Sequence, residues 1–215
     1  YGRINQNGPE RMGWRVTARN LNLNRDFVKA DTVEMRAWLA LWDRWRPDFL
    51  VDIHSTDGAD YQYTVTTDLD RESLDPGLAD WAGDYLDALE TGMAADGWPL
   101  APYVSFRKWH DPRSGLKSWV AGPRFSQGYA AARNRPGLLV ETHMLKPYPE
   151  RVRGTIALLQ RTVAFLQDQS AVLQRLVREA DTRTASAAFR QQPLALDWRM
   201  TGEAEPFTFL GVEYE

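Results

Sequence analysis

Residues 137–143 read Gly-Leu-Leu-Val-Glu-Thr-His, a short run of apolar and β-branched residues with one carboxylate inside it and one histidine at its end. Such a run predicts a strand that is buried on both faces of a sheet. Residues 48–54, Asp-Phe-Leu-Val-Asp-Ile-His, repeat the pattern. Ligands of open α/β sheets bind beyond the carboxyl ends of the strands, so we expect His54 and Glu141 to converge on one cleft.

Three helices are predicted around these strands. Asp31 is expected to cap the first, with Glu34 completing a capping box, and Pro47 ends it. The second begins at Asp75-Pro76, with proline at the first helical position, and the third follows the second strand. The order helix–strand–helix–strand–helix predicts a layered α/β fold. The apolar residues expected to face the core are Met35, Trp38, Leu39, Trp42 and Trp45, then Leu78, Trp81, Tyr85, Leu89 and Met93, then Val152, Ile156, Leu159, Val163, Leu166, Leu173 and Val177.

Two segments differ from this pattern. Residues 97–135 are irregular, rich in glycine, proline and aromatic residues, and longer than an ordinary connection, which is typical of a functional loop. After about residue 184 apolar and polar residues alternate. We therefore expect a main domain over residues 1–184 and a β-type C-terminal extension over residues 185–215, of which this chain contains only the start.

Composition excludes several classes of protein. Hydrophobic residues make up 43% of the 215 residues and charged residues 26%, which is the balance of a globular protein. The net charge of -3 argues against a nucleic-acid-binding surface, which needs a basic surplus. The sequence contains no run of 18 apolar residues, so no membrane span is predicted. The absence of cysteine excludes disulfides, a thiol nucleophile and a cysteine-ligated metal.

Glu141 and His54 are the first candidate site residues. A carboxylate among buried neighbours is costly unless it is paired or bound to a metal, and it is suited to proton transfer. A salt bridge from Glu141 to an arginine is the structural alternative. His54 fits a packed structural histidine as well as it fits a metal ligand. His143 faces the same side of its strand as Glu141, and a structural role is favoured for it.

A second group of candidates lies in residues 20–27, Asn-Leu-Asn-Leu-Asn-Arg-Asp-Phe. The alternation predicts an extended chain with its asparagines on one face. Asn24 beside Arg25 suits a carboxylate clamp, because guanidinium is a planar fork of donors. Arg15 supplies another cation nearby. The alternative is that Arg25 pairs with Asp26 in a turn.

Taken together, these motifs resemble the zinc carboxypeptidase family in order and spacing, and in particular a bacterial branch of it. The resemblance covers roughly residues 1–170. The segments that carry it are 5–8 (Asn-Gln-Asn-Gly), 14–15 (Trp-Arg), 22–27 (Asn-Leu-Asn-Arg-Asp-Phe), 52–55 (Asp-Ile-His-Ser) and 139–141 (Leu-Val-Glu).

The resemblance implies a mixed, mostly parallel sheet flanked by helices, and one Zn²⁺ held by two histidines and one glutamate. His54 would be the second ligating histidine. The family's other two ligands come from a His-x-x-Glu motif placed before the Asn-Arg block. The histidines of this chain are His54, His110 and His143, so that motif is absent from it. Catalytic zinc usually needs three protein ligands, and we expect this chain to bind it weakly.

The resemblance also implies the catalytic roles. Asn24 and Arg25 would bind the terminal carboxylate of a peptide, and Arg15 would polarise the scissile carbonyl and stabilise the oxyanion. Glu141 would be the general base that activates the zinc-bound water. Tyr129 is the candidate for the tyrosine that the family carries on a mobile loop.

The expected function is therefore a zinc-dependent carboxypeptidase that removes the C-terminal residue of a peptide with a free carboxylate. Residues 1–184 would be part of its catalytic domain, and a periplasmic or secreted location is expected. Two alternatives stay open. One is another amide hydrolysis on the same fold, by a deacylase or a cell-wall peptide hydrolase. The other is a ligand-binding domain that keeps the fold without the metal.

Overall fold

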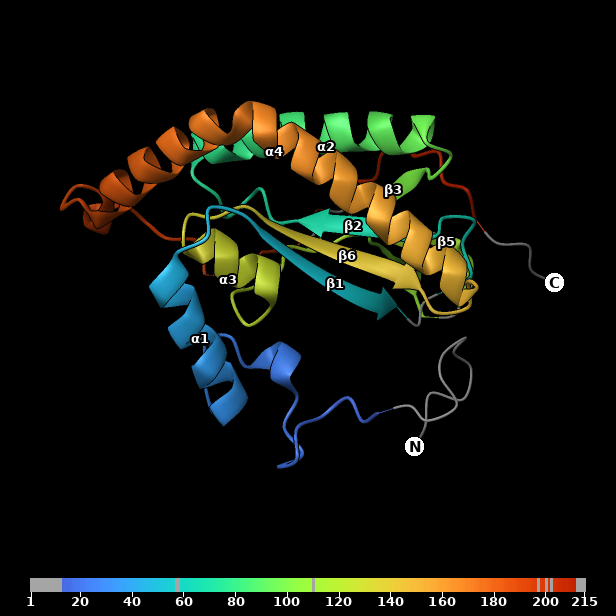
Figure 1. Cartoon of the computed structure of the whole chain (residues 1–215), viewed down its shortest axis with the longest axis horizontal. Coiled ribbons are helices and arrows are strands. Elements are labelled where there is room, and N and C mark those ends of the chain that lie inside the picture. Colours follow the sequence, from blue (N-terminus) through green and yellow to red (C-terminus); the bar gives the residue numbers. More distant parts are fainter. Residues whose placement is uncertain are drawn as a thin grey trace.

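A four-stranded mixed sheet forms the centre of the computed structural model (Figure 1). The structure describes residues 13–56, 59–109, 111–196, 198–199, 201 and 203–211. The strands lie in the order β1 (Leu50–Thr56), β6 (Gly137–His143), β2 (Val65–Leu69) and β3 (Leu100–Pro102). β1 is parallel to β6 and β3 is parallel to β2, whereas β2 and β6 are antiparallel. The predicted α/β fold with a mixed, mostly parallel sheet is confirmed.

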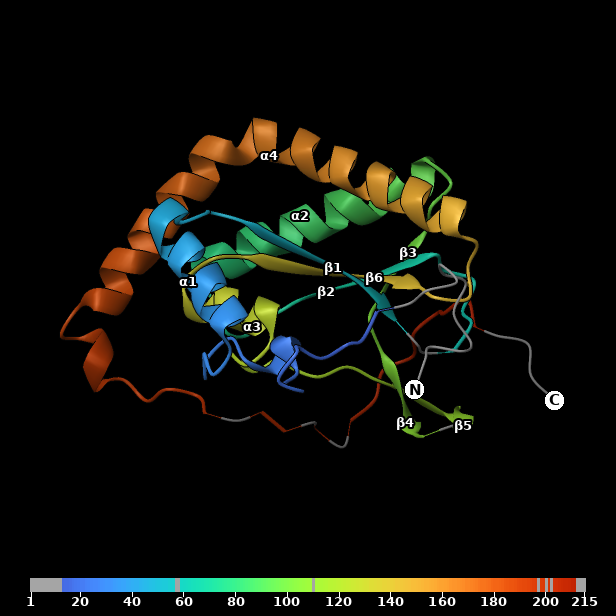
Figure 2. The ribbon, with the colours of Figure 1, turned by 60° about the horizontal axis from the view of Figure 1, so that its bottom comes forward.

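Helices cover both faces of the sheet (Figure 1). The long helices α2 (Pro76–Ala95) and α4 (Tyr148–Ala185) lie on one side. The other side carries α1 (Val33–Trp45), α3 (Ser126–Ala132) and the short 3-10 helix η1 (Leu23–Arg25). A separate two-stranded sheet, β4 (Ser105–Lys108) with β5 (Asp111–Lys117), projects from the molecule (Figure 2), and η2 (Phe189–Gln191) follows α4.

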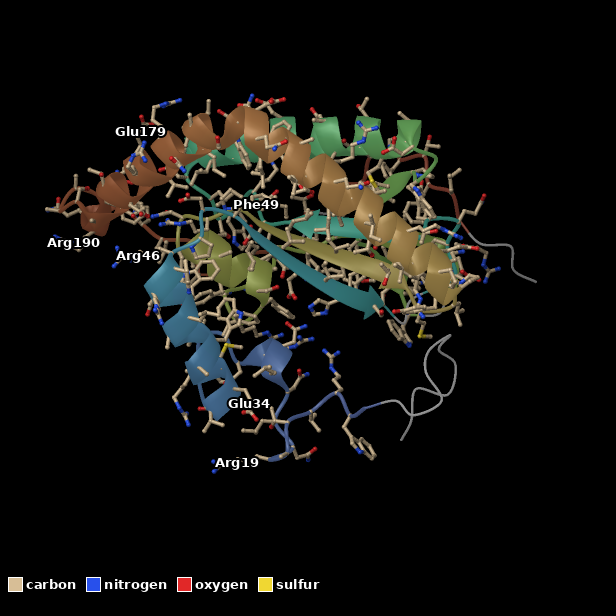
Figure 3. All side chains as sticks on the ribbon, in the orientation of Figure 1. Arg19, Glu34, Arg46, Phe49, Glu179 and Arg190 are labelled. Carbon is tan, nitrogen blue, oxygen red and sulfur yellow. The ribbon has the colours of Figure 1, made fainter. Side chains whose placement is uncertain are left out.

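The main core lies between the sheet and the α2–α4 layer. Leu138 and Val140 of β6 are fully buried in it. Figure 3 shows Phe49 in this layer, where its ring meets Tyr85 edge-on at 5.2 Å between centroids. Because side chains alternate along a strand, Glu141 points to the opposite face, toward α1 and α3. The apolar face of the sheet therefore packs against α2 and α4, and the opposite, more polar face is available for the site.

The N-terminal residues of α2 and its helical apolar pattern predict this helix correctly from the sequence. The Asp75 side chain caps it by accepting a hydrogen bond from the Gly77 amide at 3.2 Å, and Pro76 is the first helical residue. All five residues of its predicted apolar face are buried: Leu78, Trp81, Tyr85, Leu89 and Met93.

The predicted cap of α1 is wrong by one residue. Thr32, not Asp31, caps the helix, because its hydroxyl accepts a hydrogen bond from the Met35 amide at 3.0 Å. Asp26 explains the shift. Its buried carboxylate accepts hydrogen bonds from the amides of Asp31 and Thr32 and from the Thr32 hydroxyl, and it thereby places Thr32 at the helix start.

The predicted apolar stripe of α4 is partly wrong. Ile156 and Val163 are 49% and 54% exposed, whereas Leu158 is fully buried. Gly154 sets this rotation, because a Cβ there would lie only 3.2 Å from the Val65 side chain. The helix thus approaches the sheet through its small residues, a feature that an apolar periodicity does not record.

Three other expectations need correction. Strand β1 is at the sheet edge and only half-buried, with Ile53 47% exposed, so it is not covered on both faces. Residues 23–25 form the 3-10 helix η1 where extended chain was expected, with the Asn22 side chain accepting from the Asn24 amide. After Ala185 the described residues form η2 and coil without a strand, so the β-type extension is not seen there.

In the described part of the chain, no helix is long and apolar enough to cross a membrane.

Candidate active site

His54 and Glu141 lie side by side on the polar face of the sheet. β1 and β6 pair in a register that places His54 directly opposite Glu141. The His54 Nδ1 atom is 3.9 Å from the Glu141 Oε1 atom, and Glu141 is 7% exposed. The predicted convergence of the two residues is confirmed.

Asp52 completes this group. It precedes His54 by two residues on β1, so both side chains share a face. Its Oδ2 atom is 2.8 Å from the His54 Nε2 atom. This hydrogen bond raises the pKa of His54, with burial acting against it. Burial opposes ionisation of Asp52, but hydrogen bonds from His54 and Ser126 outweigh it, so the pKa of Asp52 is lowered.

The geometry of His54 fits one ligand of a metal ion. Histidine ligands usually donate their second ring nitrogen to a carboxylate, which is what Asp52 receives from Nε2, and Nδ1 faces the site. The ligand count does not fit. Among the described residues, no group of three histidine, aspartate or glutamate side chains could hold an ion. His110 lies outside these residues. The described residues therefore do not complete a zinc site.

Three arginines gather beside this group. Arg25 at the end of η1 lies over the Phe125 ring at 4.3 Å, and Arg124 lies over the same ring at 5.0 Å. Burial lowers the pKa of Arg25, and the charges of Arg15 and Arg124 lower it further. The charge of Arg15 also acts on His54. None of the three arginines forms an ion pair with a carboxylate of the described residues. An anionic ligand would relieve their mutual repulsion.

The alternative role proposed for Arg25, a pair with Asp26, is not found. The carboxylate of Asp26 is occupied by the start of α1 and lies 3.7 Å from Lys29 Nζ. Asn24 is half-buried beside Arg25, and its carbonyl accepts a hydrogen bond from the Arg25 guanidinium. This bond directs Arg25 back along η1, toward Phe125.

Tyr129 does not join the group. Its ring packs among Phe27, Trp38 and Trp42, on the side of α3 that faces α1, and its hydroxyl accepts a hydrogen bond from Arg133. The structure therefore does not support its role as the mobile tyrosine. Tyr103, which the sequence did not single out, lies near enough to Arg25 to raise the pKa of that arginine when the tyrosine is ionised.

A pocket opens next to Glu141. Its volume is about 270 Å³, and Glu141 and His143 form part of its wall. His143 is buried and its Nδ1 accepts a hydrogen bond from the Leu145 amide at 3.2 Å, as expected of the structural role favoured for it. Half of the other residues that line it are aromatic: Tyr61, Tyr63, Tyr103, Phe106 and Trp109.

Sequence reasoning missed Asp52, Tyr103 and Arg124 as site residues. The pattern Asp-x-His on a strand predicts a shared face and could have identified Asp52. Tyr103 and Arg124 carry no comparable signal, because they reach the site only through the folding of residues 97–135.

Comparisons of the chain with protein-family models, with curated proteins and with solved structures found no match.

Proposed function

We propose that the protein hydrolyses the C-terminal peptide bond of peptides that end in a free carboxylate, as a zinc carboxypeptidase-type hydrolase. The observation that carries the proposal is the pairing of His54 with Glu141 beside three arginines that lack carboxylate partners among the described residues. Hydrolysis at a terminal residue needs a carboxylate that accepts a proton and a fixed positive charge for the substrate terminus. Both features lie on the same face of the sheet.

Each residue has a defined role in this proposal. Arg25 and Arg124, with Asn24, bind the terminal carboxylate, and guanidinium groups suit this because they bind carboxylates through two parallel hydrogen bonds. Arg15 stabilises the negative charge that develops on the scissile carbonyl. Glu141 accepts a proton from the attacking water and transfers it to the leaving amine.

His54 is the one zinc ligand that this proposal assigns among the described residues. His54 has the orientation and the carboxylate partner of a metal ligand, and the remaining ligands would lie outside the described residues. None of the roles above depends on the geometry of an ion.

The test is a double-mutant cycle on the protein in zinc-containing buffer. Wild type and Arg25→Ala are each assayed with a free-acid peptide and with the same peptide amidated at its C-terminus. Loss of Arg25 should cost about 2–5 kcal/mol with the free acid, by analogy with truncation of a buried charge pair. This is a loss of roughly thirty- to several-thousand-fold in kcat/KM. The amidated peptide should show no such difference, because it lacks the group that Arg25 binds.

Arg19→Ala is the matched control. Arg19 is exposed and lies far from the sheet, at the outer end of its loop (Figure 3). Its loss should leave both substrates unaffected. Equal losses with both substrates in Arg25→Ala would make Arg25 structural. Absence of hydrolysis of any peptide by the zinc-supplied protein would contradict the proposal and favour a ligand-binding domain.

A further inference from the structure

We propose that the pocket beside Glu141, called here the aromatic pocket, binds one aromatic side chain of the substrate and thereby selects a bulky apolar C-terminal residue. The aromatic pocket is the cavity lined by Tyr61, Tyr63, Tyr103 and Phe106 together with Glu141. Which residue of the substrate enters it rests on the proposed function. Binding of the side chain itself does not depend on catalysis and can be measured separately.

The size of the aromatic pocket limits what it can hold. Its volume of about 270 Å³ lies just under the range of roughly 300–1,000 Å³ that is typical of pockets for drug-sized ligands. It therefore suits one large side chain better than an extended ligand.

The chemistry of the wall favours an aromatic group. Among the described residues that line the cavity there is no lysine or arginine, and the carboxylate is Glu141. The nearby Asp60 is paired with Lys146 at 2.8 Å. Tyr61 meets Phe106 nearly at right angles, at 83° between ring planes, and aromatic rings prefer such edge-to-face contacts with a further ring. An acidic side chain would meet repulsion from Glu141.

Tyr103 relates the aromatic pocket to the arginines. It lines the pocket, and it also lies near enough to Arg25 to affect the pKa of that arginine when the tyrosine is ionised. Glu141 also lines the pocket and lies next to His54. A substrate whose carboxylate is bound at Arg25 and whose scissile amide lies at Glu141 would therefore place its last side chain in the aromatic pocket.

The C-terminal segment holds one wall of the pocket in place. After η2 the chain crosses back over the molecule toward β4 and β5 (Figure 2). There the Phe209 ring packs on Tyr61 at 4.7 Å and on Tyr63 at 5.0 Å. The Leu210 amide donates a hydrogen bond to the Tyr63 hydroxyl at 3.1 Å. Phe209 is thus a positioning residue for the pocket, because it does not itself line the cavity.

The test measures binding of small probes to the full chain by isothermal titration. The probes are N-acetyl-phenylalanine, N-acetyl-leucine, N-acetyl-alanine and N-acetyl-glutamate, each as the free acid. N-acetyl-phenylalanine should bind about 10- to 100-fold more tightly than N-acetyl-alanine, as expected from burial of one large apolar side chain. N-acetyl-leucine should lie between them, and N-acetyl-glutamate should bind more weakly than N-acetyl-leucine. Equal affinities, or preference for the glutamate probe, would overturn the proposal.

Variants that fill the cavity connect this preference to the pocket. Val104 lines the cavity and is half-buried outside any helix or strand, so Val104→Trp should remove the difference between the phenylalanine and alanine probes. Ala59→Phe should do the same from another part of the wall and serves if Val104→Trp does not fold. Val163→Trp, at an exposed position of α4, is the matched control and should keep the preference. A preference that survives both filling variants would place the binding site elsewhere.

Phe209→Ala tests the positioning role. It should lower the affinity for N-acetyl-phenylalanine several-fold and leave the affinity for N-acetyl-alanine unchanged. Only the larger probe has a side chain that would contact Tyr61 and Tyr63, the wall residues that Phe209 positions. Equal loss for both probes would contradict the role.

One further probe separates this proposal from the proposed function. N-acetyl-phenylalaninamide lacks the carboxylate but keeps the side chain. If it binds as tightly as the free acid, the arginines do not recognise a carboxylate and the carboxypeptidase proposal fails. The ranking by side chain would then still support the aromatic pocket.

Discussion

The buried carboxylate of Asp26 stabilises both the start of α1 and the loop that carries Arg25. It is 1% exposed and accepts three hydrogen bonds, from the Asp31 amide, the Thr32 amide and the Thr32 hydroxyl. We expect Asp26→Ala to lower the free energy of unfolding by about 3 kcal/mol, because it leaves buried donors without an acceptor. Urea denaturation of the variant and the wild type measures this loss.

Asp31→Ala is the control for this prediction. The Asp31 side chain is exposed and pairs with Lys29 at the surface, a kind of pair that contributes only about 0–1 kcal/mol. A larger effect of Asp31→Ala than of Asp26→Ala would restore Asp31 as the cap that the capping-box pattern predicts.

Asp70 gives the stability a dependence on pH. Burial raises its pKa to about 6 from the ordinary 3.8, partly offset by hydrogen bonds from Ser73 and reinforced by the charges of Glu72 and Asp68. Its Oδ2 atom is buried and has no hydrogen-bond partner among the described residues. The folded state therefore holds the proton more tightly than the unfolded state does. This contribution to stability is fully present below about pH 4 and is lost as the pH rises to about 6.

Asp70→Asn should remove this dependence. The variant should be about 1–3 kcal/mol more stable than the wild type at pH 8, the range allowing for partial solvation, and similar to it at pH 3.5. Thermal or urea unfolding across this pH range provides the comparison. Glu72→Gln, at an exposed neighbouring position, should change stability much less. A stability difference that does not vary with pH would show that folding does not shift the pKa of Asp70 and would contradict this account.

At the scale of elements, one guanidinium connects three parts of the fold. Arg135, just before β6, binds Asp181 near the end of α4 through two hydrogen bonds of 2.9 and 3.1 Å. It also donates to the Pro47 carbonyl, which precedes β1, at 3.2 Å. β1 and β6 carry His54 and Glu141, so this connection supports the strands that form the site.

We expect Arg135→Ala to cost about 1–3 kcal/mol of stability, since it removes a buried guanidinium and leaves the Pro47 carbonyl and the half-exposed Asp181 carboxylate without their donor. Arg135→Lys should recover only part of the loss, because lysine lacks the planar fork. The pair Arg175–Glu179 lies on the exposed face of the same helix, so Arg175→Ala should cost less than about 0.5 kcal/mol. Equal unfolding midpoints for Arg135→Ala and Arg175→Ala would contradict this account.

The sequence predicts those elements whose signals are local. The cap of α2 and its apolar face follow from Asp75-Pro76 and from helical spacing, and the buried strand β6 coincides with the predicted residues 137–143. The cap of α1 is missed because it depends on Asp26, five residues upstream of Asp31. The Asp26 carboxylate accepts hydrogen bonds from the amides of Asp31 and Thr32 and so places Thr32 at the start of the helix. The rotation of α4 is missed because it depends on the fit of Gly154 against β2.

At the scale of the whole molecule, the same distinction applies to the site. His54 and Glu141 could be predicted to meet, because each ends a strand with the same pattern. The aromatic pocket could not be predicted, since Tyr61 and Phe209 are brought together from distant parts of the chain. The α/β order of elements therefore positions the reacting groups, whereas long-range packing determines the shape of the pocket.

The last prediction concerns zinc and the chain as a whole. Among the described residues, His54 and its hydrogen-bond partner Asp52 are present, but no group of three possible ligands is found. Three protein ligands are usual for catalytic zinc. We expect isothermal titration of this chain with Zn²⁺ to show weak binding or none. His54→Ala should weaken whatever zinc binding is measured, whereas His143→Ala should not remove a ligand, because the His143 Nδ1 atom accepts a hydrogen bond from the Leu145 amide. Tight, stoichiometric binding by this chain would mean that residues outside the described part, such as His110, complete the site with His54.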